Sequence, residues 1–593
     1  MVKIVADLDQ FPFDSIDGVQ LQARRLFPIN RHTEAKTRQA GLDRWYLVSF
    51  DTGTSLQQMA LALAEDPRIV LVEYDAYLHA IEPVKADPHE QKRVRPLSQT
   101  AMPFNDPELP YQWHYYNDGS LGEQTQPGAD INLFEAWKYC TGDPRIIVAV
   151  LDDGVMHTHE DLAANMWVNE AEAAGQPGID DDGNGYVDDI HGFNFCDMTG
   201  ILTWDKANDI GHATHVAGTI AAVTNNGKYV AGIAGGSGQG DGCRIMSCQI
   251  FSNNEATTTS NMIAALKYAA DNGAVIANNS WSYSPGDHTS DQAYEQFESG
   301  FQAAVDYFTQ YAGLDGLIDG GLVIFAAGND SYPQPSYPGA YYSTVCVTAM
   351  AADYTAAYYT NYGTGANICA PGGELIHGSI FAISSTSIGQ WGYEYMQGTS
   401  MACPHVAGCA ALGLSYALQQ GKSFTLEEYR NLLLTSVHDI NAYQVGTKPI
   451  FDYVTGTYID IPLEPYQHQL GSGYMDAHLL LMQIEGTPCL YFAAGETSYL
   501  SLDEYFGSGS SSLTYLRAEM SPEDREALGI STDPSFENGR LKIRCTRTGS
   551  ARIRVTAIIG GQQVGGDEMG GMEVSREFEL IVRTNVAGNG GWL

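Results

Sequence analysis

Three polar side chains of complementary chemistry stand at the ends of apolar segments in this 593-residue chain. Asp152 closes the run "RIIVAVLD", His212 opens "GHATHVAGTIAA", and Ser400 opens "GTSMACPHVAG". A serine hydroxyl is a weak nucleophile unless an imidazole takes its proton, and that imidazole needs a carboxylate to fix its tautomer. Asn329 ends the run "GLVIFAAGN", so its amide is a candidate donor to an oxyanion. These residue types predict acyl-transfer chemistry at the edge of a sheet.

The stretch "GTSMACPHVAG" holds two further reactive side chains. At about 100° per residue of an α-helix, His405 lies about 140° around the helix from Ser400, so the base must come from elsewhere in the chain. Cys403 lies about 60° from Ser400 and is interpreted as a packing residue. The alternative is a cysteine hydrolase that uses Cys403. Pro404 is expected to fall in the first helical turn, where it would remove no intrahelical hydrogen bond.

These segments resemble the motifs of the subtilases, the subtilisin-like serine proteases. They follow that family's order, Asp then His then Asn then Ser, and the resemblance extends over about residues 110–484. Further family-like landmarks are "HEDL" (159–162), "APGG" (370–373) and "GSGYMDA" (471–477). The resemblance implies a serine endopeptidase that works through an acyl-enzyme. In it Asp152 orients the base, His212 is the general base and acid, Ser400 attacks, and Asn329 donates to the oxyanion.

Three neighbours of these residues are expected to be structural. Asp153 stands where the family usually has a small Ser or Thr, and His215 matches a second, non-catalytic histidine of the family motif. Ala213 replaces the glycine that the family usually has after the catalytic histidine, and we expect its methyl group to be tolerated.

The resemblance also implies that a peptide substrate binds as an added β-strand along the segment "NNSWSY" (278–283). Ser282 stands where the family commonly has glycine, which predicts a narrower wall. Core packing is the alternative role for Trp281. The expected substrate-binding residues are Ser280, Trp281 and Ser282 on the edge, and Ala326, Ala327 and Gly328 at the floor of the first pocket.

An acidic stretch, "IDDDGNGYVDDIHGFNF" (179–195), places oxygen side chains at alternate positions. Ca²⁺ prefers six to eight oxygen ligands from a flexible loop. The pattern begins like an EF-hand, but its twelfth position is His191 rather than Glu, so we expect a structural calcium loop of another type. A solvated acidic turn is the alternative. The expected ligands are Asp180, Asp182, Asn184, the Tyr186 carbonyl, Asp188 and Asp189.

The elements that must position these residues read as an α/β fold. Continuous apolar strands between helices predict a subtilisin-like parallel sheet covered on both faces, within residues 106–484. Functional residues gather at the carboxyl ends of such strands. Strands are expected at 145–152, 243–250, 273–280, 321–329 and 344–350, and the clearest helices at 257–273 and 400–418.

Two further domains flank the predicted catalytic domain. Residues 1–82 predict strand, helix and strand at 44–50, 55–67 and 68–81, and resemble the α+β propeptide of the family, which assists folding and then inhibits. Residues 83–105, with prolines and the basic run "QKRVR", are expected to be a linker and processing zone. An unrelated accessory domain is the alternative. Residues 487–593 show short alternating strands typical of an immunoglobulin- or cadherin-like β-sandwich.

Composition limits the partners. A net charge of −40 disfavours nucleic acid and anionic membrane surfaces. No window reads as a membrane span, and "MVKIVADLDQ" is not a signal peptide. None of the ten cysteines forms a CxxC pair, and Cys489 and Cys545 are placed where they could pair. The resemblance implies a secreted, periplasmic or cell-surface monomer, made as a zymogen, that acts on protein or peptide substrates. A catalytically idle binding protein that uses its β-sandwich is the alternative.

Overall fold

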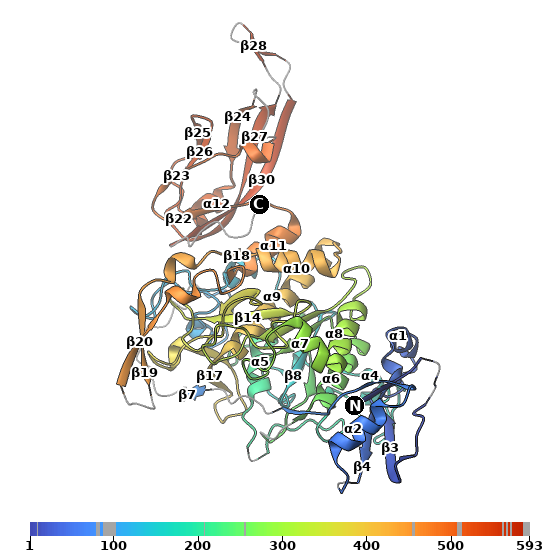
Figure 1. Cartoon of the computed structure of the whole chain (residues 1–593). Helices are drawn as coiled ribbons and strands as arrows, with labels where there is room; N and C mark the ends of the chain where they lie inside the picture. Colours follow the sequence, from blue (N-terminus) through green and yellow to red (C-terminus); the bar gives the residue numbers. More distant parts are fainter. Residues whose placement is uncertain are drawn as a thin grey trace.

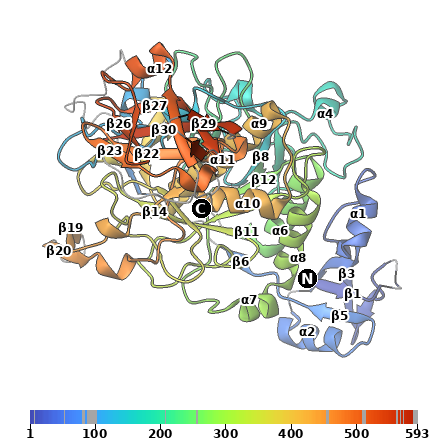
Figure 2. The ribbon, with the colours of Figure 1, turned by 90° about the horizontal axis from the view of Figure 1, so that it is seen from above.

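Three units follow one another along the chain, with the first and last attached to different sides of a central body (Figures 1 and 2). The central body is the α/β unit, and it carries the residues singled out above. The computed structural model describes residues 1–6, 8, 10–51, 53–78, 84–86, 102–206, 208–253, 257–452, 457–506, 513–559, 562–564, 567–569 and 572–584. The predicted processing motif "QKRVR" lies outside these described residues.

The central body is built on a nine-stranded sheet of order β18-β21-β15-β14-β13-β12-β8-β10-β9. Neighbouring strands are parallel except at the β18–β21 edge. In sheet order the strands are β18 (Val437–His438), β21 (Tyr474–Met475), β15 (Ile368–Pro371), β14 (Val345–Met350), β13 (Leu322–Ala326), β12 (Ile276–Asn279), β8 (Ile147–Asp152), β10 (Arg244–Gln249) and β9 (Gly192–Asn194).

Helices cover both faces of the sheet, which explains why its strands are apolar throughout. On β8, Val148 and Val150 join the core that contains α5 (His212–Ala221), α9 (Thr399–Gln420) and α11 (Ala477–Glu485). The alternate residues, Ala149 and Leu151, join the opposite core with α6 (Thr259–Asp271) and α8 (Ser299–Tyr311). The α/β fold with a doubly covered parallel sheet is confirmed.

Helix α9 passes through the interior of the body. Within the described residues it is the one helix long and apolar enough to cross a membrane by length and composition, and 94% of its apolar window is buried inside the protein. The sequence analysis, which found no window that reads as a membrane span, did not single out this helix. Burial among other helices and strands accounts for the apolar character of α9.

The first unit contains a five-stranded sheet of order β2-β3-β4-β1-β5. The predicted strand, helix and strand correspond to β4 (Trp45–Phe50), α2 (Leu56–Ala64) and β5 (Ile69–Val72). The remaining elements, β1 (Val2–Ile4), β2 (Ser15–Ile16), β3 (Val19–Arg25) and α1 (Glu34–Gln39), were not anticipated. Strand β3, "VQLQARR", is mostly polar and exposed, so it offers little hydrophobic pattern.

The last unit contains two sheets that share one apolar core. One has the order β22 (Cys489–Ala493), β30 (Met572–Arg583), β27 (Gly549–Ile559) and β24 (Leu513–Glu519), and the other β23 (Thr497–Leu500), β26 (Arg540–Arg544) and β25 (Ser535–Glu537). Phe492 and Ile553 of the first sheet and Leu541 and Ile543 of the second are buried in that core. All ten cysteines are free thiols, including Cys489 and Cys545.

Other elements complete the described chain. The helices are α3 (Leu133–Ala136), α4 (Glu170–Ala174), α7 (Asp291–Phe297), α10 (Leu426–Thr435) and α12 (Pro522–Ala527). The strands are β6 (Tyr77–Leu78), β7 (Val84–Ala86), β11 (Thr257–Thr258), β16 (Ile383–Thr386), β17 (Tyr393–Gln397), β19 (Thr447–Asp452), β20 (Thr457–Pro462), β28 (Gln562–Val564) and β29 (Asp567–Met569).

Candidate active site

Asp152 and His212 form a buried pair at the carboxyl edge of the sheet. Asp152 is the last residue of β8, and His212 is the first residue of α5. His212 Nδ1 lies 2.8 Å from Asp152 Oδ1 and 2.9 Å from Oδ2. A carboxylate at this distance from Nδ1 favours the tautomer in which Nε2 is free of a proton, which is the form needed in a general base.

Asp153 holds the start of α5 in place. Its carboxylate accepts hydrogen bonds from the backbone N–H groups of His212 at 3.1 Å and Ala213 at 2.6 Å. Burial, and then the charge of Asp152, raise the pKa of Asp153 to about 7. Ala213 is fully buried in α5, so its methyl group is packed within the body. The contacts of Asp153 are those of a structural residue.

Ser400 lies at the second position of α9, directly after a glycine turn. Gly398 has φ +149°, a conformation that residues with a side chain rarely adopt, and it is the N-cap residue directly before α9. Ser400 Oγ donates to the Ser280 carbonyl at 2.9 Å, and Ser280 Oγ donates to the Ser400 carbonyl at 2.8 Å. These reciprocal bonds join the nucleophile candidate to the segment that follows β12.

Asn329 is fixed beside the same helix start. Its Oδ1 accepts from the backbone N–H and the hydroxyl of Thr399, both at 2.8 Å. Because the oxygen is held in this way, the orientation of the amide is set, and its Nδ2 lies on the Gly398 side, where an added Cβ would be 3.4 Å away. An amide donor next to Ser400 is the arrangement that an oxyanion requires.

The two other reactive groups of "GTSMACPHVAG" have structural contacts. His405 Nδ1 contacts the Met401 carbonyl at 2.7 Å, and its Nε2 contacts His114 Nδ1 at 2.8 Å. Burial lowers the pKa of His405 to about 4. Cys403 is fully buried 3.7 Å from the Asn279 carbonyl, and burial raises the pKa of its thiol, so it is not a thiolate. His215 Nε2 similarly contacts the Ile383 carbonyl at 3.0 Å.

The side chain of Trp281, predicted to line the substrate edge, lies in the core instead. Trp281 is 3% exposed, its Nε1 donates to the Leu151 carbonyl at 3.1 Å, and its ring packs against Phe325 at 5.1 Å. The side chain therefore belongs to the core, and only the backbone of Trp281 remains for the predicted edge. Ser280 and Ser282 flank it and are also buried.

The predicted pocket floor is built from tightly packed backbone. Ala326 ends β13, and Ala327 and Gly328 follow it at the carboxyl end of that strand. Gly328 has φ +103°, and a Cβ there would lie 2.2 Å from Asn361 Nδ2. A side chain at Gly328 would therefore displace Asn361, so the floor at this point must be bare backbone.

Two segments of the chain itself pair as added strands with the body. β6 pairs antiparallel with β11, matching Leu78 with Thr257. β7 pairs antiparallel with β17, matching Val84 with Gln397, three residues before Ser400. The chain that leaves the first unit thus adds strands to the body before and after residues 79–83.

The acidic loop brings two of the predicted ligands together with one carboxylate that was not predicted. Ligand atoms of Glu172, Asp180 and Asp182 lie within 4.8 Å of one another. Glu172 comes from α4 and was missed, because it lies outside the alternating pattern in sequence. Its Oε1 accepts from the Asp181 N–H at 2.7 Å, and its Oε2 accepts from the Asp188 N–H at 2.9 Å, so it also organises the loop.

The other predicted ligands have protein partners. Asp188 accepts from the Gly178 N–H at 2.8 Å, and Asn184 Oδ1 accepts from the Tyr186 N–H at 2.7 Å. Asp189 accepts from the Tyr268 hydroxyl at 2.7 Å, and burial raises the pKa of Asp189 to about 7. The Tyr186 side chain is buried, which leaves its carbonyl as the group relevant to the prediction.

Sequence comparisons with known proteins agree with the arrangement of Asp152, His212 and Ser400 in the site. The model of the subtilase family matches residues 143–457. Halolysin of Haloferax mediterranei is 32% identical over 50% of this chain and 47% of its own length, and a thermophilic serine proteinase of Bacillus sp. is 31% identical over 47% and 54%. A solved protease of Pseudoalteromonas arctica, 27% identical, aligns with a TM-score of 0.43 over 64% of this chain and 99% of that one. The chain spans about half the length of the curated relatives it matches.

Proposed function

Because the chain belongs to the subtilase family, we propose that it is a serine-type endopeptidase whose catalytic residues are Asp152, His212, Ser400 and Asn329. The observation that carries this proposal is the buried Asp152–His212 pair at the edge where α9 presents Ser400. The names of two relatives describe extracellular proteases, which supports secretion of this chain as well.

Each residue has a defined step in the proposed reaction. His212 Nε2 takes the Ser400 proton as Oγ attacks the scissile carbonyl, and Asp152 stabilises the imidazolium that forms. In the resting geometry the Ser400 hydroxyl donates to the Ser280 carbonyl, so this bond must break before attack. Asn329 Nδ2 donates to the oxyanion, and the backbone N–H groups at the start of α9 add the positive end of the helix dipole. His212 then protonates the leaving amine, and water hydrolyses the acyl-enzyme.

A fluorophosphonate probe tests this function directly. The wild type should become labelled and should cleave peptides, whereas Ser400→Ala should do neither. Cys403→Ser should be labelled like the wild type, because Cys403 is a buried packing residue. A folded wild type that is never labelled, even after the first unit is removed, would favour the idle binding protein. Loss of labelling in Cys403→Ser would favour the cysteine hydrolase.

The first unit is proposed to be an inhibitory propeptide. Its added strands on β11 and β17 support this, because β17 ends three residues before Ser400 and a substrate is also expected to bind as an added strand. These pairings narrow the expected cleavage site to the bonds between Leu78 and Val84. Mass spectrometry of the incubated protein should find a fragment that ends there, and a fragment that ends in 87–105 instead would contradict the assignment.

The acidic loop is proposed to hold a structural Ca²⁺. The donor set fits, because the Glu172, Asp180 and Asp182 cluster offers hard carboxylate oxygens of the kind Ca²⁺ prefers. A bound Ca²⁺, with two positive charges, would offset most of the negative charge of the three carboxylates and stabilise the loop. Calcium should raise the melting temperature of the wild type but not that of Glu172→Gln. No rise in the wild type would contradict the proposal. We propose that the last unit is an immunoglobulin- or cadherin-like sandwich that braces the body.

A further inference from the structure

A β-hairpin outside the central sheet inserts one lysine into the body. The hairpin consists of β19 and β20, which pair antiparallel with Thr447 opposite Pro462. It projects from one side of the body in Figure 1. Among the hairpin side chains that the structure describes, only Lys448 is buried. A lysine is rarely buried without a partner of opposite charge, so its surroundings are informative.

Lys448 forms a buried ion pair with Glu374. Its Nζ lies 2.9 Å from both carboxylate oxygens of Glu374 and donates to the Ala356 carbonyl, also at 2.9 Å. The side chains are 5% and 4% exposed. Burial raises the pKa of Glu374, and the charge of Lys448 opposes this effect. Without Lys448, Glu374 would be a buried carboxylate with no countercharge from the hairpin, which is strongly unfavourable.

Hydrogen bonds lead from Glu374 to the strand before the nucleophile. Glu374 Oε1 accepts from the Tyr358 N–H at 2.7 Å. The Tyr358 hydroxyl accepts from Gln397 Nε2 at 2.7 Å, and Gln397 Oε1 accepts from the Leu375 N–H at 2.6 Å. Gln397 is the last residue of β17. Both ends of its amide are therefore held near Glu374: one by Tyr358, which is bonded to Glu374, and the other by Leu375, which follows Glu374 in sequence.

The neighbouring tyrosine fixes the next residue. The Tyr359 hydroxyl accepts from the Gly398 N–H at 2.9 Å and donates to the Gly373 carbonyl at 2.7 Å. The Gly398 N–H also approaches the Gly372 carbonyl at 3.2 Å. Residues 358–359 and 372–375 therefore surround the Gln397–Gly398 turn, and that turn determines where α9 begins and where Ser400 lies.

We propose that Lys448 is a positioning residue for the reaction, holding Glu374 so that Tyr358 and Tyr359 fix the turn that presents Ser400. The inference rests on the proposed function and assigns the β19–β20 hairpin a part in it. A carboxylate without its countercharge would draw residues 373–375 toward water and loosen Gln397 and Gly398. A displacement of about 1 Å at a reacting group can lower a rate roughly a hundredfold.

The test compares variants that are expressed as the full chain and allowed to process. Each is measured in peptide hydrolysis and in fluorophosphonate labelling. Lys448→Met should lower kcat and the labelling rate roughly tenfold to a hundredfold, with KM changed by less than about twofold. Lys448→Met/Glu374→Gln should recover most of this loss, because a neutral amide needs no countercharge. Tyr358→Phe, which removes the acceptor for Gln397 Nε2, should lower kcat several-fold.

Lys267→Met is the matched control. Lys267 pairs with Asp271 at 2.5 Å, and both side chains are as buried as those of Lys448 and Glu374, but the pair lies within α6. This variant should lose thermal stability and keep kcat. A folded Lys448→Met with unchanged kcat would overturn the proposal. If that variant does not fold, wild-type kcat in Tyr358→Phe would overturn it. A wild type that is never labelled refutes the proposed protease function instead.

Discussion

The first and last units of the chain are attached to the same body by different kinds of contact. The first presents two carboxylates to helix starts: Glu73 Oε2 accepts from the Gly300 N–H of α8 at 3.0 Å, and Asp75 accepts from the Ser260 N–H and hydroxyl of α6 at 2.9 and 2.8 Å. These bonds use groups at or near a helix end that water can also satisfy. Met1, Leu26, Phe27, Leu42 and Trp45 of this unit also join the apolar core that contains α6 and α8. The strands β6 and β7 that follow form short backbone pairings with the body.

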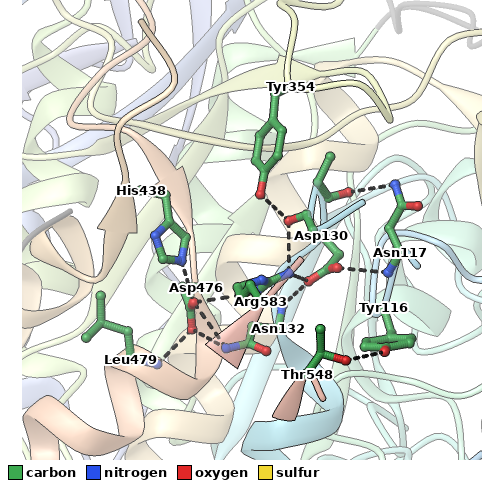
Figure 3. Close-up of polar contacts among 12 residues, drawn as sticks. Tyr116, Asn117, Asp130, Asn132, Tyr354, His438, Asp476, Leu479, Thr548 and Arg583 are labelled. Atoms are coloured by element: carbon green, nitrogen blue, oxygen red, sulfur yellow. Dashed lines mark hydrogen bonds and ion pairs between the residues drawn. The ribbon is translucent and has the colours of Figure 1, made fainter. Parts of the chain in front are cut away.

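The last unit is attached through buried charges (Figure 3). Arg583 lies 2.6 Å from Asp130 and 3.9 Å from Asp476, and both aspartates are fully buried in the body. Beside this group, Glu579 is fully buried, 3.3 Å from His478 and 3.4 Å from Arg552. Separating this unit would leave charges of both signs in apolar surroundings.

The difference indicates which unit can leave. Once the first unit and its apolar side chains have left, water can satisfy the helix-start groups that Glu73 and Asp75 contact. Asp130 and Asp476 are fully buried and share the guanidinium of Arg583, so departure of the last unit removes the countercharge of both. We therefore expect the last unit to remain in the mature enzyme, and the following predictions test this contrast.

The largest effect is expected from Arg583→Met. It leaves Asp130 and Asp476 without their common guanidinium, and breaking a buried pair typically lowers the free energy of unfolding by about 3–5 kcal/mol. Urea unfolding of the Ser400→Ala background would measure this. Arg583→Lys should lose less, since the charge remains. A loss below about 1 kcal/mol in Arg583→Met would mean that the last unit is not anchored by these charges.

The sequence predicts the body better than it predicts these attachments. The strand ends at Asp152 and Asn329 and the helix starts at His212 and Ser400 are local patterns, so the site could be assembled from them. Glu172, Trp281 and the Lys448–Glu374 pair depend on residues far apart in the chain. No local spacing distinguishes a buried Lys448 from the exposed residues beside it in the hairpin.

The second effect is a pH dependence of the first attachment. Burial raises the pKa of Glu73 from 4.5 to about 7 in the attached state, with Glu298 and Asp75 adding negative charge and the Met1 amino group opposing them. The attached state thus binds the proton more tightly than the released one. Attachment is strongest below about pH 4.5, weakens as the pH rises to about 7, and stays weak above it.

Release of the cleaved first unit should therefore be at least roughly tenfold faster at pH 8 than at pH 5, as followed by size-exclusion chromatography. Glu73→Gln should flatten this profile, because glutamine does not titrate. Asp66→Asn, at a partly exposed carboxylate of the same unit that pairs with Arg68, should leave the profile unchanged. An unchanged profile in Glu73→Gln would show that another group sets the pH dependence.

A smaller effect is expected from Asp75→Ala. It removes the side-chain acceptor from the start of α6, a loss that typically amounts to about 1 kcal/mol, and should speed release about fivefold at a fixed pH. Unfolding of the body after the first unit has left should not change, because the body then lacks Asp75. A change in release caused equally by Asp66→Asn would point to net charge rather than capping.

The smallest effect distinguishes buried charge from simple contact within the second attachment. Two tyrosines contact the last unit through their hydroxyls. Tyr139 donates to buried Glu579 at 3.0 Å, whereas the Tyr116 hydroxyl lies at the longer distance of 3.5 Å from the Thr548 hydroxyl. Tyr116→Phe keeps the stacking on Phe134 and loses a long neutral bond, so the free energy of unfolding should change by less than about 0.5 kcal/mol. Tyr139→Phe should lose more than about 1 kcal/mol, since hydrogen bonds to charged groups are stronger. Equal losses in the two variants would mean that contact area, rather than the buried charges, holds the last unit on the body.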